Sequence, residues 1–90
     1  MMSIAEKISH LIEQEIDVNK IQIVDESYKH ANHQKDTKGG HFKLFIVSDA
    51  FIDIGLLDRH KLIYKILDKM MKVEIHALSM KLLTNLEYDK

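Results

Sequence analysis

The stretch from His41 to Ser79 constrains the fold most, because its apolar pattern changes from strand to helix and back to strand. Residues 41–48 carry apolar side chains on both faces of an extended chain, which predicts a central, buried strand. Residues 58–71 then repeat apolar residues at helical spacing, with Asp58 placed to cap the helix. Residues 73–82 return to strand character, and simple alternation puts Ile75 and Ala77 on one face and His76 and Leu78 on the other. A helix that joins two consecutive strands predicts a parallel pair with a right-handed crossover.

The flanking segments complete the predicted order. Ser3 and Glu6 have the spacing of a capping box, so a helix is expected to begin there and to end near Asp17. Residues 20–25 combine β-branched residues with a polar one and predict a strand. Residues 26–40 are polar and lead back to the central strand, which makes the first two strands an antiparallel hairpin. A second capping box, Thr84-Asn85-Leu86-Glu87, predicts a short terminal helix.

These elements predict an α+β fold: one small domain over residues 1–90, in α-β-β-α-β-α order, with a three-stranded mixed sheet. The apolar fraction of 46% and the charged fraction of 30% are ordinary for a globular chain. The longest apolar run, Leu44 to Val47, is far shorter than the roughly 18 residues of a membrane helix. With no cysteine in the chain, a soluble cytoplasmic protein is expected.

Histidine is the one residue type in excess, with six in 90 residues. Three of them lie where a metal site could form: His30 and His33 in the long polar connection, and His76 on the last strand. A closed zinc site needs four ligands, so these imidazoles would form only part of one. The alternative for the remaining histidines is structural: a surface position for His10, a neutral, hydrogen-bonded side chain for His60, and a strand-edge cap for His41.

Basic residues recur along the crossover helix and suggest a second kind of site. Arg59, Lys61, Lys65 and Lys69 could form a face that neutralises phosphates, although such rows are more often solvated helix surfaces. The net charge of −1 lacks the strong positive field of an obligate nucleic-acid binder. No phosphate loop, dinucleotide fingerprint or nucleophile elbow is present, so an enzyme is the least expected class.

Several short elements, taken together, resemble the BolA family over about residues 21–87. The elements are Asp25-Glu26-Ser27, His30-Ala31, His41-Phe42, Ile46-Val47-Ser48, Phe51, Arg59-His60-Lys61, Tyr64, Leu67 and His76-Ala77-Leu78. The resemblance implies a fold similar to the type II KH domain. It also implies a partner, a monothiol glutaredoxin, with which BolA-like proteins can share a 2Fe-2S cluster that includes a glutathione thiol.

For this chain the resemblance assigns His76 as one cluster ligand and His30 as the loop ligand, with His33 as a nearby substitute. Replacing thiolates by imidazoles makes such a cluster less negative and raises its potential. No cofactor is expected for the isolated chain, which is expected to be a monomer or a weak homodimer. Some BolA proteins are described as transcriptional regulators, so DNA binding through the basic helix remains the alternative function.

Two departures from the family pattern affect the scaffold more than the ligands. Asp53 stands where the family usually has glycine, and the terminal element here reads Thr84-Asn85-Leu86-Glu87-Tyr88 instead of a Thr-Pro-Glu-like element ending in tryptophan. The Gly-x-x-Gly loop with which KH domains clamp nucleotides is also absent.

Overall fold

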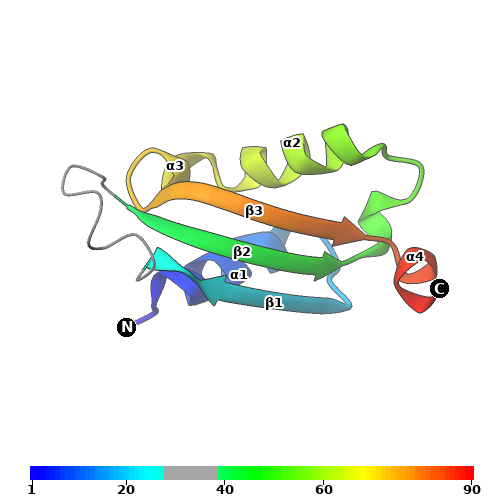
Figure 1. The fold of residues 1–90 in the computed structure, drawn as a ribbon, viewed down its shortest axis with the longest axis horizontal. Helices are drawn as coiled ribbons and strands as arrows, with labels where there is room; N and C mark the ends of the chain where they lie inside the picture. The colour runs from blue at the N-terminus through cyan, green and yellow to red at the C-terminus, as the bar shows by residue number, and fades with distance from the viewer. Residues whose placement is uncertain (28–38) are drawn as a thin grey trace.

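The computed structural model describes residues 1–27 and 39–90, so His30 and His33 lie outside the described residues. The elements, in chain order, are α1 (Ile4–Glu15), β1 (Lys20–Asp25), β2 (Gly40–Val47), the short 3-10 helix η2 (Asp49–Phe51), α2 (Leu56–Ile66), α3 (Asp68–Met71), β3 (Ile75–Leu83) and α4 (Asn85–Asp89). The predicted α+β class and order are confirmed, except that the crossover contains η2 and two α-helices instead of one helix. Figure 1 shows them packed against one three-stranded sheet.

The sheet has the order β1-β2-β3, with β2 in the centre. Strand β1 pairs with β2 in antiparallel orientation, and β3 pairs with β2 in parallel orientation, as the sequence predicted. In this register Ile46 of β2 lies between Ile21 of β1 and Leu82 of β3. Alternation along each strand therefore places one set of side chains toward the helices and the other set on the opposite face.

Two helices begin with the capping boxes that the sequence predicted. The Glu6 amide donates to the Ser3 hydroxyl at 3.1 Å, and the Ser3 amide donates to the Glu6 carboxylate at 2.9 Å. In α4, Thr84 and Glu87 make the same reciprocal pair. These bonds satisfy amides that have no partner within a helix, so both starts are fixed locally.

The core lies between the sheet and helices α1, α2 and α3, all on one face of the sheet, while the other face is left uncovered by these helices (Figure 1). Burial of apolar surface at about 25 cal/mol per Å² is the main force that holds these layers together. The members of this cluster are Ile8, Ile12, Phe42, Leu44, Ile46, Phe51, Ile63, Leu67, Met70, Ile75 and Leu82. Within the described residues, no helix has the length and apolar character needed to cross a membrane.

The crossover differs from the sequence prediction at its start and in its interior. Helix α2 begins at Leu56, after Gly55, and Asp58 lies inside its first turn instead of capping it. The helix is interrupted at Leu67 (φ −96°, ψ 13°), and α3 continues from Asp68. Since Leu67 is fully buried and Met70 nearly so, the break keeps the apolar side of both short helices on the sheet.

The first residues of β3 also differ from the predicted alternation. Gly40 pairs with Ile75, but His41 pairs with Ala77, so a bulge inserts an extra residue into β3. After the bulge Leu78 lies opposite the buried Phe42, whereas the simple alternation had placed Leu78 on the face away from Ile75. That predicted face assignment is wrong because a bulge changes the side of every residue that follows it.

Candidate functional site

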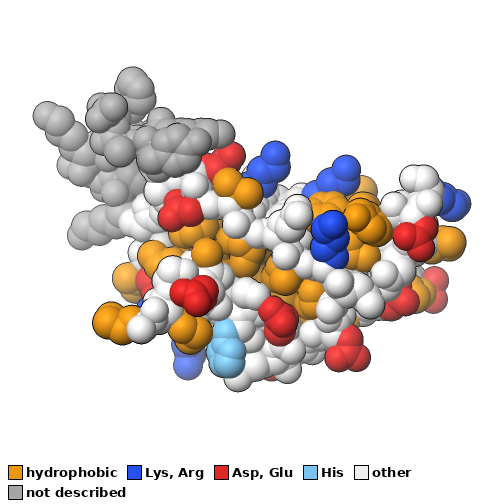
Figure 2. Space-filling model, turned by 90° about the horizontal axis from the view of Figure 1, so that it is seen from below, with side chains coloured by type: hydrophobic (Ala, Val, Ile, Leu, Met, Phe, Trp, Pro, Cys, Tyr) orange, Lys and Arg blue, Asp and Glu red, His pale blue; other side chains and the backbone are white. Residues whose placement is uncertain are grey.

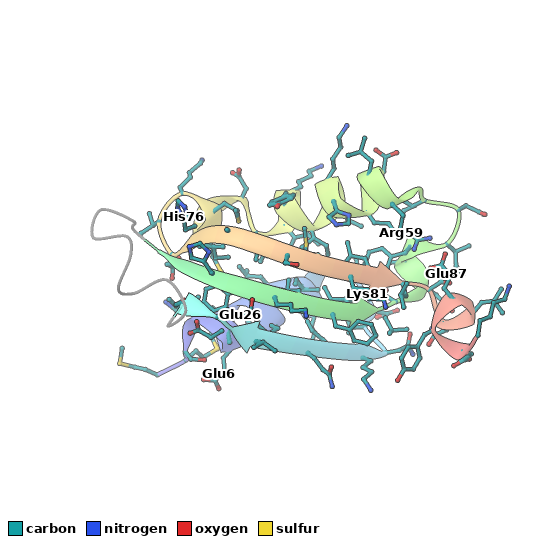
Figure 3. All side chains as sticks on the ribbon, in the orientation of Figure 1. Glu6, Glu26, Arg59, His76, Lys81 and Glu87 are labelled. Atoms are coloured by element: carbon teal, nitrogen blue, oxygen red, sulfur yellow. The ribbon has the colours of Figure 1, made fainter. Side chains whose placement is uncertain are left out.

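His76 lies at the start of β3, exposed to solvent, where the polar connection rejoins the sheet (Figure 3). The amide of Gly40 donates to the Glu74 carbonyl at 2.9 Å and ties the two segments together. Gly39 has a positive φ of 83°. A Cβ there would lie 2.9 Å from the carbonyl oxygen of Val73 and 3.1 Å from the backbone amide nitrogen of His76. Glycine at 39 therefore lets the incoming chain pass directly against the backbone that carries His76.

The structure places His41 beside His76, and the sequence had not predicted this pair. The ring centroids of the two imidazoles are 5.0 Å apart and the ring planes are tilted by 44°. His41 is fixed by its backbone, because its amide donates to the Ser27 hydroxyl at 3.1 Å and its carbonyl accepts from the Glu26 amide at 2.8 Å. The bulge at the start of β3 lies at this same corner, and His76 is the extra residue between the pairs Gly40–Ile75 and His41–Ala77.

The residues that lead into the polar connection are also held at this corner. The Ser27 amide donates to the Asp25 carboxylate at 2.9 Å. The pKa of Asp25 is lowered, first by the hydrogen bond from the Ser27 side chain and then by that from its backbone. Ser27 and Gly40, on the two sides of the polar connection, are therefore both hydrogen-bonded to residues at this corner, Ser27 to His41 and Gly40 to Glu74.

A surface hollow of about 430 Å³ opens next to His76. Its lining combines apolar side chains with one lysine and one imidazole: Met71, Lys72, Val73, Ile75 and His76. Val73 keeps 70% of its surface exposed, which is high for a valine in a folded domain. The hollow therefore places an exposed apolar side chain next to the imidazole of His76.

His41 and His76 provide two nitrogen donors, fewer than a metal centre needs. Among residues 1–27 and 39–90, no group of three or more histidines, cysteines or acidic residues is placed to hold a metal ion. The expected ligands His30 and His33 lie outside the described residues. Any metal centre here would need donors from the polar connection, from another molecule, or from both.

The other histidines have the structural surroundings that were expected for them. His10 is exposed on α1 and lies within hydrogen-bonding distance of Gln14, at 3.1 Å. His60 Nδ1 donates to the Leu56 carbonyl one turn earlier in α2, at 2.8 Å. Neither of these histidines lines the hollow next to His76.

Arg59 does not lie on the basic surface to which the sequence assigned it. Lys61, Lys65 and Lys69 are exposed on α2 and α3, but the relative exposure of Arg59 is 6%. Its guanidinium donates to the Leu82 carbonyl at 2.9 Å and to the Glu87 carboxylate at 2.7 Å and 3.1 Å. The expected grouping of Arg59 with the lysines is therefore wrong: its donors tie α2 to β3 and α4.

Helices on one face of a three-stranded mixed sheet, with an exposed imidazole at one end of that sheet, define a small α+β domain. Residues 12–87 match the family described as BolA-like protein, and the chain belongs to that family. The structure of the chain also superposes on those of solved BolA domains. The BolA domain of SufE1 from Arabidopsis thaliana has a TM-score of 0.84 at 40% identity, covering 97% of this chain and 98% of that one.

Curated relatives connect the chain to two kinds of protein. SufE-like protein 1 of Arabidopsis thaliana is 40% identical over 79 residues, which cover 81% of this chain but only 21% of that longer protein. The DNA-binding transcriptional regulator BolA of Haemophilus influenzae is 36% identical over 87 residues, covering 97% of this chain and 82% of that protein. The Escherichia coli regulator of the same name is 32% identical over 88 residues, covering 98% of this chain and 82% of that protein.

Proposed function

We propose that this chain is a binding and assembly protein that pairs with a monothiol glutaredoxin and supplies imidazole ligands to a shared 2Fe-2S cluster. The observation that carries the proposal is the exposed imidazole of His76, next to His41 and to a hollow with exposed apolar side chains. A cysteine-free chain can take part in such a centre only with nitrogen or oxygen donors. The partner's cysteine and a glutathione thiol would provide the sulfur ligands.

Chain connectivity supports a loop histidine as the second ligand. The hydroxyl of Ser27 accepts a hydrogen bond from the amide of His41. His30 is three residues after Ser27 in the chain, and three residues span at most about 11 Å. That length of chain is compatible with a ligand on the polar connection, so His30 is proposed as the second ligand and His33 as its alternative. The adjacency of His41 adds a third imidazole that could replace either of them or orient His76.

The test is cluster assembly with a monothiol glutaredoxin, iron, sulfide and glutathione, followed by visible absorption and circular dichroism. A heterodimer with a spectrum different from that of the glutaredoxin homodimer is expected. His76→Ala should abolish the difference, and His30→Ala, His33→Ala and His41→Ala, made singly, should identify the second ligand. His10→Ala is the matched control, because His10 is an exposed histidine away from the site. An unchanged heterodimer spectrum with His76→Ala would refute the assignment.

A second function, DNA-binding transcriptional regulation, is favoured by the names of the bacterial relatives and by the exposed lysines of α2 and α3. Lys61, Lys65 and Lys69 would neutralise duplex phosphates, so binding should weaken steeply with salt. Charge reversal at these lysines should remove it. Binding that is indifferent to salt or to charge reversal would contradict this function, whatever the outcome of the cluster experiment.

A further inference from the structure

The sheet face opposite the helices carries a cluster of lysines around an aromatic ring. The alternation set by the buried Phe42, Leu44 and Ile46 places Lys43 and Phe45 on this face. Position by position, the open-face residues are Lys20, Gln22 and Val24 on β1, His41, Lys43, Phe45 and Val47 on β2, and Ala77, Ser79, Lys81 and Leu83 on β3. We call this set the open sheet face.

The charges of the open sheet face all have one sign. Lys43 lies opposite Val24 and Ser79, and Lys81 lies opposite Phe45, so the two lysines are diagonal neighbours. Neither is among the ion pairs of the described residues, and both side chains are exposed. One acidic residue, Glu26, follows β1 in the same alternation as Lys20, Gln22 and Val24, and its amide donates to the carbonyl of His41. Lysines gathered within one face repel one another, and an anionic ligand would relieve that repulsion.

Aromatic rings lie within this positive surface. Phe45 is half-buried, and the centroid of its ring is 5.8 Å from that of Tyr88 in α4. Lys20 completes the group: its Nζ donates to the Tyr88 hydroxyl at 3.1 Å and lies 5.4 Å from the centre of that ring. In Figure 2 lysine and arginine side chains project along the upper edge of the molecule, and most acidic side chains lie below them. In Figure 3 Lys81 lies toward the C-terminal end of β3.

From this arrangement we propose that the open sheet face binds single-stranded nucleic acid, with Lys20, Lys43 and Lys81 contacting phosphates and Phe45 offering its ring to a base. Single-strand binders combine a positive surface that follows the backbone with aromatic side chains on which bases stack. Duplex DNA hides its base faces and would use only the lysines. An acidic peptide would likewise gain nothing from the ring. The combination of ring and lysines therefore favours an unpaired strand.

The proposed strand-binding surface, made of Lys20, Lys43, Phe45 and Lys81, is separate from both sites described above, although His41 of the first site lies at one end of the same face. It lies on the sheet face opposite to the layer that contains α2, so it does not include Lys61 or Lys65. It is also independent of the cluster proposal, since it uses neither His76 nor a partner protein. An assay with the full chain alone, without iron, sulfide or glutaredoxin, therefore tests this surface without testing cluster ligation.

The experiment measures fluorescence anisotropy of a labelled oligothymidylate about ten nucleotides long, within the site sizes of single-strand binders. With three lysine contacts, the slope of log K against log salt should be near −2, at about −0.7 per contact. Lys43→Gln together with Lys81→Gln should raise Kd at least about fivefold and make the slope less negative by about 1.4. Lys61→Gln with Lys65→Gln removes the same charge from the α2 surface considered above for duplex DNA, and it should raise Kd by less than the Lys43 and Lys81 pair does. The control is Lys7→Gln on α1, an exposed lysine that no proposed site uses, and it should leave both values unchanged.

Two further variants report on the aromatic ring. Phe45→Leu keeps an apolar side chain and should weaken binding about tenfold through lost stacking. Because the chain has no tryptophan, Phe45→Trp introduces a single indole whose fluorescence should be quenched when oligothymidylate binds. Thermal melting of each variant separates binding losses from folding losses. The pair of exposed lysines tests the surface even if the Phe45 variants fail to fold.

Three results would overturn the proposal. An increase in Kd from the Lys61 and Lys65 pair as large as that from the Lys43 and Lys81 pair would assign the binding to α2 instead. Tighter binding of duplex DNA than of oligothymidylate, or no effect of Phe45→Leu in a folded variant, would remove the role of the ring. Competition by polyglutamate as effective as that by unlabelled oligothymidylate would identify an acidic protein segment as the ligand class instead.

Discussion

Replacing Arg59 with methionine should destabilise the protein strongly, because Arg59 connects three elements from a buried position. Its Nε donates to the Ile54 carbonyl at 2.7 Å, and Nη1 donates to the Leu82 carbonyl at 2.9 Å. The same guanidinium forms a two-pronged pair with Glu87 in α4 (Figure 3). Methionine retains the length and much of the packing of the side chain but cannot donate to any of these acceptors.

The size of the effect follows from the two backbone acceptors. A hydrogen bond from a charged donor contributes about 1.5 kcal/mol or more, so losing both lowers the free energy of unfolding by about 3 kcal/mol. The Glu87 side chain is 43% exposed and can return to water, so its share is left out of this sum. In a domain of this size, each kcal/mol lowers Tm by about 4–8 °C, which predicts a fall of about 12–24 °C.

The assay is urea and thermal unfolding of Arg59→Met beside Lys65→Met, which makes a comparable change at an exposed position of the same helix. The control should change the free energy of unfolding by less than about 0.5 kcal/mol. Arg59→Lys should recover only part of the loss, because an ammonium cannot reproduce the planar fork of a guanidinium. If Arg59→Met cost less than about 1 kcal/mol, the structural role derived from burial and hydrogen bonding would be refuted.

Three other predictions concern single residues. The hydrogen bond from Arg59 is the largest cause that lowers the pKa of Glu87 from 4.5 to about 2. The contribution of Glu87 to stability is therefore present above pH 4.5 and lost as pH falls toward 2. The difference in Tm between wild type and Glu87→Gln should shrink over that range. A difference in Tm that does not depend on pH would contradict this linkage. Asp53 has a positive φ of 63°, so Asp53→Gly should raise the free energy of unfolding by about 0.5 kcal/mol in urea titrations. The reason is that the relief of backbone strain exceeds the entropy cost of glycine. A loss of stability would be evidence against that strain. Gly39→Ala should lower the free energy of unfolding by about 2 kcal/mol, since φ is 83° and the added Cβ would lie 2.9 Å from a backbone carbonyl oxygen. A melting curve like that of wild type would contradict this prediction.

Most of the fold could be predicted from the sequence because its signals are local. The capping boxes at Ser3 and Thr84 operate over three residues, and both appear in the structure with their reciprocal hydrogen bonds. The strand predicted over residues 20–25 has those bounds in the structure, and β2 differs from its prediction by one residue at each end. The antiparallel and parallel pairings followed from a hairpin and a helical crossover, which chain connectivity restricts to few topologies.

The candidate site could be predicted only in part. His76 was singled out from the sequence, and the structure places it exposed at a corner of the sheet. His41 was interpreted as a strand-edge cap, and its adjacency to His76 depends on the register of β2 against β3, which no residue pattern indicated. Arg59 was assigned to a basic surface because it is charged and stands beside Lys61, but the position of α4 buries it.

The sequence by itself determined the order of strands and helices, their caps and the apolar faces, because hydrophobic periodicity and capping act within a few residues. Only the tertiary structure decided which charged and imidazole side chains meet and which face of the sheet stays open. Those outcomes depend on strand register, on one bulge and on which helix covers which surface. They bring together residues such as His41 and His76, or Arg59 and Glu87, whose separation in the chain gives no local signal of contact.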